Sequence, residues 1–108
     1  STTMTRIEQL EQFITEDPSD PFPRYALALE FLHLDPAKAQ AQFESLISQF
    51  PDYLQTYYPA AHLLAERGDA QGADTLFQSG IAKARQQGDR KTEHELRQAY
   101  SQWQFEQS

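Results

Sequence analysis

The chain repeats one pattern of apolar and small residues at a spacing of 33 to 34 residues. One set of three positions occurs three times, as Leu10, Phe13 and Ile14, as Phe43, Leu46 and Ile47, and as Phe77, Gly80 and Ile81. A second set occurs twice, as Leu27, Ala28 and Phe31 and as Ala60, Ala61 and Leu64. Self-similarity at a period of this length is typical of chains that stack copies of one small helical unit. The repeat therefore predicts a helical solenoid, and it says more about architecture than about a particular partner.

Helical periodicity is visible along almost the whole chain, and the alternation typical of strands is nearly absent. Prolines and glycines divide the chain into segments. Pro18 and Pro21, for example, forbid the continuation of the first helix, because proline removes a backbone donor and restricts the residue before it. Pro23 is tolerated in the first turn of the second helix. We expect six helices, at about residues 5–17, 22–34, 36–50, 57–67, 70–87 and 90–105.

Short polar residues and glycines mark the expected helix ends. Asp35 before Pro36 is typical of an N-cap followed by the first helical residue. With Thr56 as the N-cap of the fourth helix, Pro59 falls in the first turn, where its missing N–H has no intrahelical acceptor. Gly68 can adopt a left-handed conformation and so end that helix, and the following aspartate can cap the next one.

At 108 residues the chain is long enough to remove about two thirds of its unfolded surface from water, and we expect one domain over residues 1–108. It contains no cysteine, which suits a reducing compartment and leaves no thiol for metal binding or nucleophilic catalysis. No apolar run approaches the roughly 20 residues of a membrane span, and no signal-peptide pattern precedes the first helix. We therefore expect a cytoplasmic chain with no membrane partner. Ser1, Thr2 and Thr3 precede Met4 and receive no structural role.

The net charge of −7 is unevenly distributed along the chain. Residues 1–54 hold nine acidic and three basic side chains, whereas residues 55–108 hold seven and six. The chain lacks the basic stripe that binds a phosphate backbone by counterion release, so we expect no nucleic-acid partner. A local basic cluster is either a solvated surface or a patch that steers an acidic partner. It consists of Lys83, Arg85, Arg90, Lys91 and Arg97.

The phasing of these residues resembles the tetratricopeptide repeat family, whose motif is W-x2-L-G-x2-Y, then A-x3-F, then P. The first repeat matches it at Leu27, Ala28, Phe31, Ala39, Phe43 and Pro51, and the second at Tyr57, Ala60, Ala61, Leu64, Ala73 and Phe77. The chain departs from the motif where Arg24 replaces the tryptophan and where Lys83 and Ala84 replace the closing proline of the second repeat.

The resemblance implies an all-α fold, a right-handed superhelical stack of antiparallel helix pairs. We expect about two and a half repeats plus a C-terminal capping helix. The N-terminal half-repeat would span residues 5–17, the two repeats 22–51 and 53–87, and the capping helix 90–106. Leu96, Tyr100 and Trp103, at helical spacing, would cover the end of the stack.

The motif has a mechanical reason. Ala28 and Ala61 lie where the two helices of a pair approach, and a larger side chain there would push the helix axes apart. Gly80 fits a close crossing in the same way. Phe43 and Phe77 would fill the gap between layers, so that their truncation to alanine should cost about 3 to 5 kcal/mol of stability.

The resemblance also implies where a ligand binds, because the leading helices of the repeats line the concave side of the solenoid in this family. The candidate groove residues are Tyr25, Leu29, Leu32 and His33 on the first leading helix and Tyr58, His62, Ala65 and Glu66 on the second. They are more apolar and aromatic than a solvated surface requires, which favours an amphipathic helix or an extended apolar peptide as the ligand. Alternatively, Leu29 and Leu32 pack against the terminal helices. Phe22 is interpreted as a core or staple residue.

The function that follows is a non-catalytic protein-interaction module that binds a protein or peptide partner of unknown identity in its groove. The alternative is a structural protein that forms a homodimer through the groove or the terminal helices. Large rings near the ends of the chain favour that alternative, because exposed clusters of such groups often form interfaces. They are Tyr53, Tyr57, Tyr100, Trp103 and Phe105. Of these, Tyr57 is expected to pack within its repeat and Trp103 to seal the cap, and Phe105 is the most readily assigned to a partner.

The sequence offers little support for a catalytic site or a metal site. His33 and His62 with Glu66 resemble a partial metal site, but no third convincing ligand accompanies the two imidazoles. No serine lies in a G-x-S-x-G turn, and the four glycines form no phosphate-binding loop. We therefore expect no enzymatic activity, no metal and no cofactor.

Overall fold

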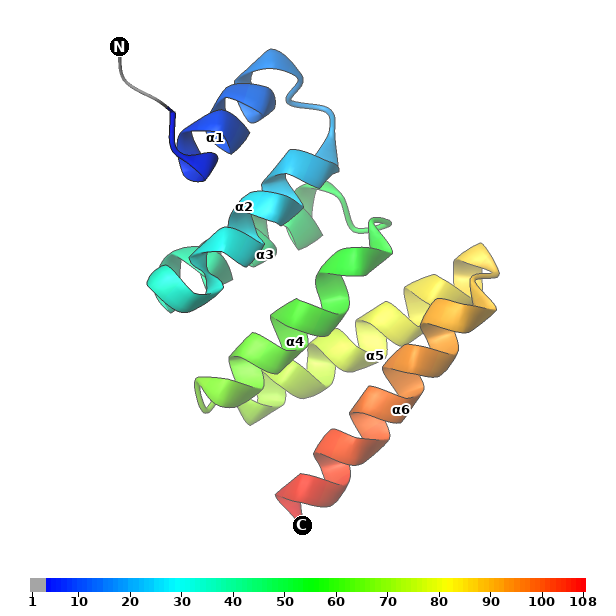
Figure 1. Ribbon diagram of the computed structural model, residues 1–108. Coiled ribbons are helices and arrows are strands. Elements are labelled where there is room, and N and C mark those ends of the chain that lie inside the picture. Colours follow the sequence, from blue (N-terminus) through cyan, green and yellow to red (C-terminus); the bar gives the residue numbers. More distant parts are fainter. Residues whose placement is uncertain (1–3) are drawn as a thin grey trace. The chain divides into compact units, whose positions relative to one another are not determined.

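The computed structural model describes residues 4–108, so that Ser1, Thr2 and Thr3, which received no structural role, lie outside the described residues. Within that range the chain forms six α-helices and one short 3-10 helix, and no strand occurs there (Figure 1). The chain divides into two compact units, one ending at Tyr53 and one beginning at Leu54. None of the helices in the described range combines the length and the apolar character that crossing a bilayer requires.

The N-terminal unit contains three helices, each packed against the next. They are α1 (Arg6–Glu16), α2 (Pro21–Leu34) and α3 (Pro36–Gln49). A capping box begins α1, where Thr5 Oγ1 accepts from the Glu8 amide at 3.1 Å and Glu8 Oε1 accepts from the Thr5 amide at 3.1 Å. These bonds to Thr5 lower the pKa of the Glu8 carboxyl. Asp35 caps α3 as predicted, with its carboxylate accepting from the Lys38 amide at 3.3 Å.

The C-terminal unit contains a 3-10 helix and three α-helices, in which α5 packs against both α4 and α6. They are η1 (Leu54–Thr56), α4 (Tyr57–Glu66), α5 (Ala70–Gln87) and α6 (Arg90–Gln107). Gly68 and Gly88 end α4 and α5 with φ of 88° and 73°, in the left-handed region that favours glycine. Asp69 and Asp89 then cap the following helices, accepting from backbone amides at 2.9 and 3.0 Å. The predicted role of Gly68 and the following aspartate is therefore confirmed.

Two helix starts differ from the prediction. The second helix begins at Pro21 rather than near Phe22, because Asp20 precedes it as N-cap and accepts from the Phe22 amide at 3.0 Å. Thr56 does precede α4, but its side chain makes no capping bond, because its backbone is already helical, with φ −69° and ψ −35°, at the end of η1. Thr56 is fully buried, and within the described residues its Oγ1 has no hydrogen-bond partner.

The repeated residues form the cores of both units. In the N-terminal unit the buried residues include Leu10, Leu27, Ala28, Ala39, Phe43 and Leu46. In the C-terminal unit they include Tyr57, Ala60, Ala61, Ala73, Phe77, Ile81, Ala84 and Leu96. The prediction that small residues lie at helix contacts and phenyl rings between helices is thereby confirmed. Among the repeated positions, Ile14, Phe31 and Ile47 are only half-buried, and Phe13 is 48% exposed.

Gly80 marks a close helix crossing of the C-terminal unit, where α5 packs against both α4 and α6. A Cβ atom added to Gly80 would lie 2.7 Å from Tyr57 Cβ and 3.1 Å from Leu96 Cδ1. The first distance is shorter than real Cβ contacts allow. The absence of a side chain at Gly80 therefore lets all three helices approach.

The last helix is fixed to α5 by rings and by two hydrogen bonds of Tyr100. The Phe77 ring lies 5.5 Å from the Tyr100 ring and 5.7 Å from the Trp103 ring, measured between centroids. The Tyr100 hydroxyl donates to Asp74 Oδ1 at 2.5 Å and accepts from Gln78 Nε2 at 3.1 Å. The bond to Asp74 raises the pKa of Tyr100, because it favours the neutral phenol. The predicted packing of Tyr100 and Trp103 is thus present.

Gly80→Ala tests the close crossing. Alanine is the better helix former by about 1 kcal/mol, yet we expect the substitution to lower the free energy of unfolding by about 1 to 3 kcal/mol, because the new methyl group collides with Tyr57. Urea unfolding followed by circular dichroism measures the difference. Ala82→Gly on the exposed side of α5 is the control and should cost about 1 kcal/mol from propensity alone. A Gly80→Ala protein more stable than the parent would show that the helices do not approach as described.

Candidate functional site

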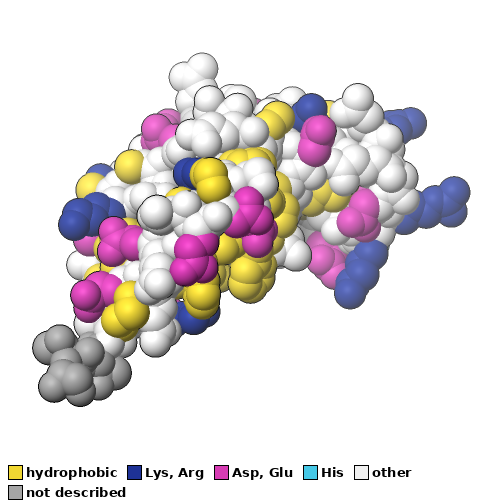
Figure 2. All heavy atoms as spheres, turned by 90° about the horizontal axis from the view of Figure 1, so that it is seen from above, with side chains coloured by type: hydrophobic (Ala, Val, Ile, Leu, Met, Phe, Trp, Pro, Cys, Tyr) yellow, Lys and Arg dark blue, Asp and Glu magenta, His cyan; other side chains and the backbone are white. Residues whose placement is uncertain are grey.

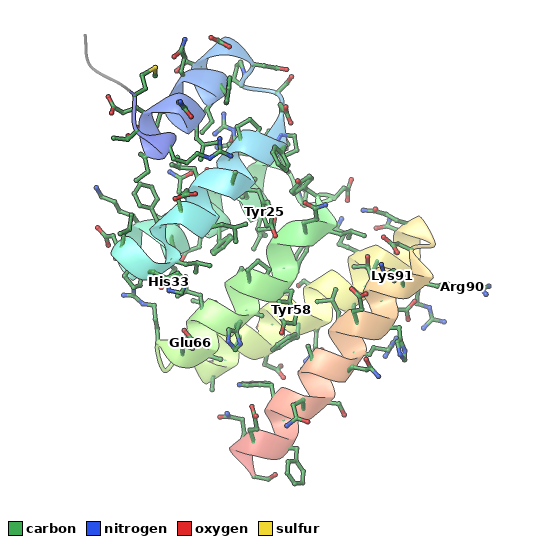
Figure 3. The ribbon with its side chains drawn as sticks, viewed as in Figure 1. Tyr25, His33, Tyr58, Glu66, Arg90 and Lys91 are labelled. Carbon is green, nitrogen blue, oxygen red and sulfur yellow. The ribbon has the colours of Figure 1, made fainter. Side chains whose placement is uncertain are left out.

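The first group of predicted groove residues lies along α2 in the N-terminal unit, where Figure 3 labels Tyr25 and His33. Leu29 is 37% exposed, and His33 is exposed near the helix end. Tyr25 and Leu32 are half-buried. Their spacing along α2 places the four side chains on one broad side of the helix. The structure thus brings the group together as a surface that mixes apolar and polar side chains.

Tyr25 is held by a neighbouring ring from the same unit. The rings of Tyr25 and Tyr53 meet edge to face, with centroids 5.8 Å apart and planes at 66°. Burial raises the pKa of the Tyr25 phenol. The pKa of Tyr53 is raised by burial first and then by the charges of Tyr25 and Asp20. The Tyr25 ring is therefore already ordered in the unbound chain.

The second group lies along α4 in the C-terminal unit, where Figure 3 labels Tyr58 and Glu66. Tyr58 is 51% exposed, and its ring stacks on the His62 imidazole with centroids 6.2 Å apart and planes at 14°. His62 Nε2 in turn lies 3.1 Å from Glu66 Oε1. Residues four apart lie above one another on a helix, so the three side chains form a continuous ladder along α4. Ala65, the fourth member of this group, is half-buried.

The exposure of this ladder limits what it contributes to stability. The His62 and Glu66 side chains are 62% and 64% exposed, and the contact becomes an ion pair only when the imidazole is protonated. Exposed pairs of this kind contribute about 0 to 1 kcal/mol. The ladder therefore orders the side chains of α4 without being needed for folding, as expected of a surface that is available to a ligand.

The sequence interpretation of Phe22 is wrong. It was assigned to the core or to a staple, yet 56% of its surface is exposed in the structure. The signal that could have identified it is its spacing, because Phe22 lies seven residues before Leu29 and therefore on the same side of α2. Phe22 joins the exposed apolar residues of this helix.

The possible metal ligands and the basic cluster are the other polar features that the sequence singled out. Within residues 4–108, no three side chains of histidine, cysteine, aspartate or glutamate are grouped so as to hold a metal ion. In the basic cluster, Arg97 forms an ion pair with Glu93 at 2.9 Å, while Arg90 and Lys91 are exposed at the start of α6 (Figure 3). The nearby Asp89 is engaged with Thr92, whose amide and hydroxyl bonds lower the pKa of the carboxyl.

Three solved structures resemble the chain. A solution structure of a tetratricopeptide repeat domain protein from Salinibacter ruber is 40% identical in sequence, with a TM-score of 0.75 over 80% of this chain and 88% of that chain. A crystal structure of a tetratricopeptide repeat domain protein from the same organism is 39% identical, with a TM-score of 0.72 over 78% and 94%. A solution structure of a protein from Bordetella parapertussis shares the fold at 22% identity, with a TM-score of 0.79 over 96% and 91%.

No protein-family model and no curated protein sequence matches the chain. The similarity of the chain to known proteins therefore rests on the solved structures. The fold of these structures agrees with the all-α helical repeat predicted from the 33 to 34 residue period.

The ionisation of Tyr25 tests the geometry of the α2 surface. Because burial disfavours the phenolate, the pKa of Tyr25 in the folded chain lies above the ordinary tyrosine value of 10.0. Folding is therefore stabilised at neutral pH by this group, and that contribution is lost as the pH rises through the folded pKa. In an absorbance titration, the difference between the parent and Tyr25→Phe should show a phenol that ionises later than tyrosine in the urea-unfolded chain. A difference curve that coincides with the unfolded titration would contradict the described burial.

Proposed function

The chain belongs to the tetratricopeptide repeat family, and from that premise we propose that it is a non-catalytic protein-interaction module that binds a peptide or helix of a partner protein. Helical repeats of this family typically serve protein–protein interaction. We also propose a cytoplasmic location, which fractionation of cells that express the tagged chain tests.

One observation supports the proposal above others. Both leading helices expose apolar or aromatic side chains to solvent, although their exposure contributes nothing to the stability of the fold. Leu29 on α2 and Tyr58 on α4 are the clearest cases. In the family, the corresponding helices line the binding surface. The proposed binding residues are Tyr25, Leu29, Leu32 and His33 on α2, and Tyr58, His62 and Glu66 on α4.

The side chains of these two surfaces are suited to binding at low entropic cost. Tyr25 is held by Tyr53, and Tyr58 is stacked on His62. Ordering a free side chain at an interface costs about 0.5 to 1.5 kcal/mol, so a ring that is already ordered avoids part of that cost. Tyrosines are frequent binding hot spots, because they bury a large ring and keep a hydroxyl for hydrogen bonding. We expect the two tyrosines to contribute most to affinity.

Affinity capture from a native lysate tests the proposal. We expect the double variant Tyr25→Ala/Tyr58→Ala to retain about a tenth or less of the partner captured by the parent chain, because each tenfold loss corresponds to about 1.4 kcal/mol. Thermal unfolding of both proteins checks that the half-buried Tyr25 can be replaced without unfolding the chain. Phe105→Ala, which removes an exposed ring from the last helix, is the matched control. If the double variant captures the same partners in the same amounts, these surfaces do not bind them.

A second candidate function is self-association through the terminal helix. Phe105 supports it, because this ring is 77% exposed, more than any other large hydrophobic residue of the described chain. Single exposed hydrophobic residues are common, but a phenyl ring near the chain end can anchor a dimer.

Light scattering at several protein concentrations distinguishes the two candidates. If the chain forms a homodimer through α6, the measured mass of the parent should rise with concentration. Phe105→Ala should keep the mass of the monomer. A parent chain that stays monomeric throughout would contradict the second candidate and leave the interaction module as the proposed function.

A further inference from the structure

One side of α2 carries a contiguous set of apolar residues that joins two of the predicted groove residues, Tyr25 and Leu29, with Phe22 and Ala26. We call Phe22, Tyr25, Ala26 and Leu29 the α2 apolar face. Phe22 and Leu29 are exposed, and Tyr25 and Ala26 between them are half-buried. Their spacing of three, four and seven residues places them on one side of the helix over about two turns. The face is therefore a ridge about 10 Å long.

The other sides of α2 are already used by the core of the N-terminal unit. Leu27 and Ala28 are buried, and α2 packs against both α1 and α3. The helix is thus apolar around most of its circumference. A helix of this composition is normally covered on all sides, whereas Phe22 and Leu29 remain open to solvent. Exposed apolar surface that is not needed for the core commonly marks an interaction site.

The charge around this face selects the kind of partner. The N-terminal unit holds nine acidic and three basic side chains, which gives a net charge of −6. Acidic side chains (magenta) lie among hydrophobic ones (yellow) at the left of Figure 2, over the N-terminal part of the chain. Glu30 borders the face directly, because it is exposed, follows Leu29 and lies one turn after Ala26.

Two of the three basic side chains of the unit contact a backbone carbonyl or an aromatic ring. The Arg24 guanidinium donates to the Pro18 carbonyl at 3.2 Å and lies over the Phe50 ring at 5.7 Å from its centroid. The Lys38 ammonium lies over the Phe31 ring at 5.6 Å. Both cations are thus occupied by contacts that involve no carboxylate. The acidic surface is left to attract a cationic ligand.

From the exposed ridge and the charge that surrounds it, we propose that the α2 apolar face binds a cationic amphipathic helix of a partner protein. This inference rests on the proposed function, because it specifies the ligand of the same α2 surface and adds Phe22 to it. The apolar side of the ligand covers Phe22 and Leu29, and its lysine or arginine residues lie opposite Glu30 and the other carboxylates. A second copy of this chain fits poorly, because it would bring two units of net charge −6 together.

The geometry is compatible with a helix as ligand. Packed helices lie about 8 to 10 Å apart, so apolar residues of the ligand at three- and four-residue spacing reach the ridge. Lysine and arginine side chains can extend past their own apolar stems to place the charge at the rim. Affinity then depends on both parts of the surface, the ridge for contact area and the acidic surroundings for charge.

Fluorescence anisotropy with synthetic peptides tests the inference on the full chain. The probe is a labelled 18-residue amphipathic helix of leucine and lysine. One comparison peptide replaces lysine by glutamate, and another has the same leucine and lysine content in an order that spreads leucine around the helix. We expect the amphipathic lysine peptide to bind at least about tenfold more tightly than either comparison peptide, with an affinity that falls as salt is raised.

Substitutions then locate the binding site. Phe22→Ala and Leu29→Ala should each raise the Kd of the lysine peptide about tenfold, because each removes a side chain that the ligand covers. Leu34→Ala removes an equally apolar and still more exposed residue from the end of the same helix, and it should change the Kd less than about twofold. Glu30→Gln should weaken binding by about threefold, and Glu44→Gln on α3 should have a smaller effect.

Several results would overturn the inference. Equal binding of the scrambled lysine peptide would mean that charge alone attracts it, and equal binding of the glutamate peptide would remove the role of charge. Equal effects of Phe22→Ala and Leu34→Ala would place the ligand elsewhere. A concentration-dependent dimer that Phe22→Ala abolishes would identify a second copy as the occupant.

The two proposals fail separately. Suppose that the lysine peptide does not bind but Tyr25→Ala/Tyr58→Ala still loses its captured partners. The proposed interaction function is then supported, and the proposal of a cationic amphipathic helix as ligand is contradicted. If the double variant captures every partner unchanged while Phe22→Ala weakens the peptide, the ridge binds cationic helices without being the surface used for those partners.

Discussion

The close approach of paired helices at small side chains is the interaction on which the rest of the structure depends. Ala28 and Ala39 are fully buried in the N-terminal unit, and Ala61 and Ala73 are fully buried in the C-terminal unit. A backbone can approach another closely only where no large side chain separates them. Phenyl rings then fill the wider spaces beside these contacts, as Phe77 does between α5 and the rings of α6. The same arrangement in both units is the physical meaning of the sequence repeat.

This packing also determines which side chains are left for function. Each leading helix buries part of its surface against neighbouring helices, so only the side chains left over can meet solvent or a partner. On α2 the remaining side is a ridge of Phe22 and Leu29, in an acidic unit. On α4 it is the ladder from Tyr58 to Glu66. The two surfaces differ in chemistry although the helices occupy equivalent places in the repeat, which indicates that the repeat preserves packing and lets the surface vary.

The sequence predicted the features that short-range rules control. The left-handed Gly68, the caps at Asp35 and Asp69 and the burial of Ala61 and Gly80 all follow from backbone geometry and from the motif. The exposure of Phe22 was missed, because a phenyl ring next to prolines was interpreted as part of a staple rather than by its position around α2. Thr56 was predicted as an N-cap but makes no side-chain capping bond, because a 3-10 turn precedes the helix. The pattern of residues gives no sign of that turn. The binding role of the α2 and α4 residues stays a prediction, because whether a surface binds depends on the ligand as much as on the residues of the surface.

The free energy of unfolding of Ala61→Leu tests the central claim most directly, with Ala82→Leu on the exposed side of α5 as its matched control. Leucine at the buried position should force the paired helices apart and lower the free energy of unfolding by about 1 to 3 kcal/mol, while leucine at the exposed position should change it by less than about 0.5 kcal/mol. If both proteins unfold at the same urea concentration as the parent chain, the helices do not touch at their small side chains, and the packing described for both units is contradicted.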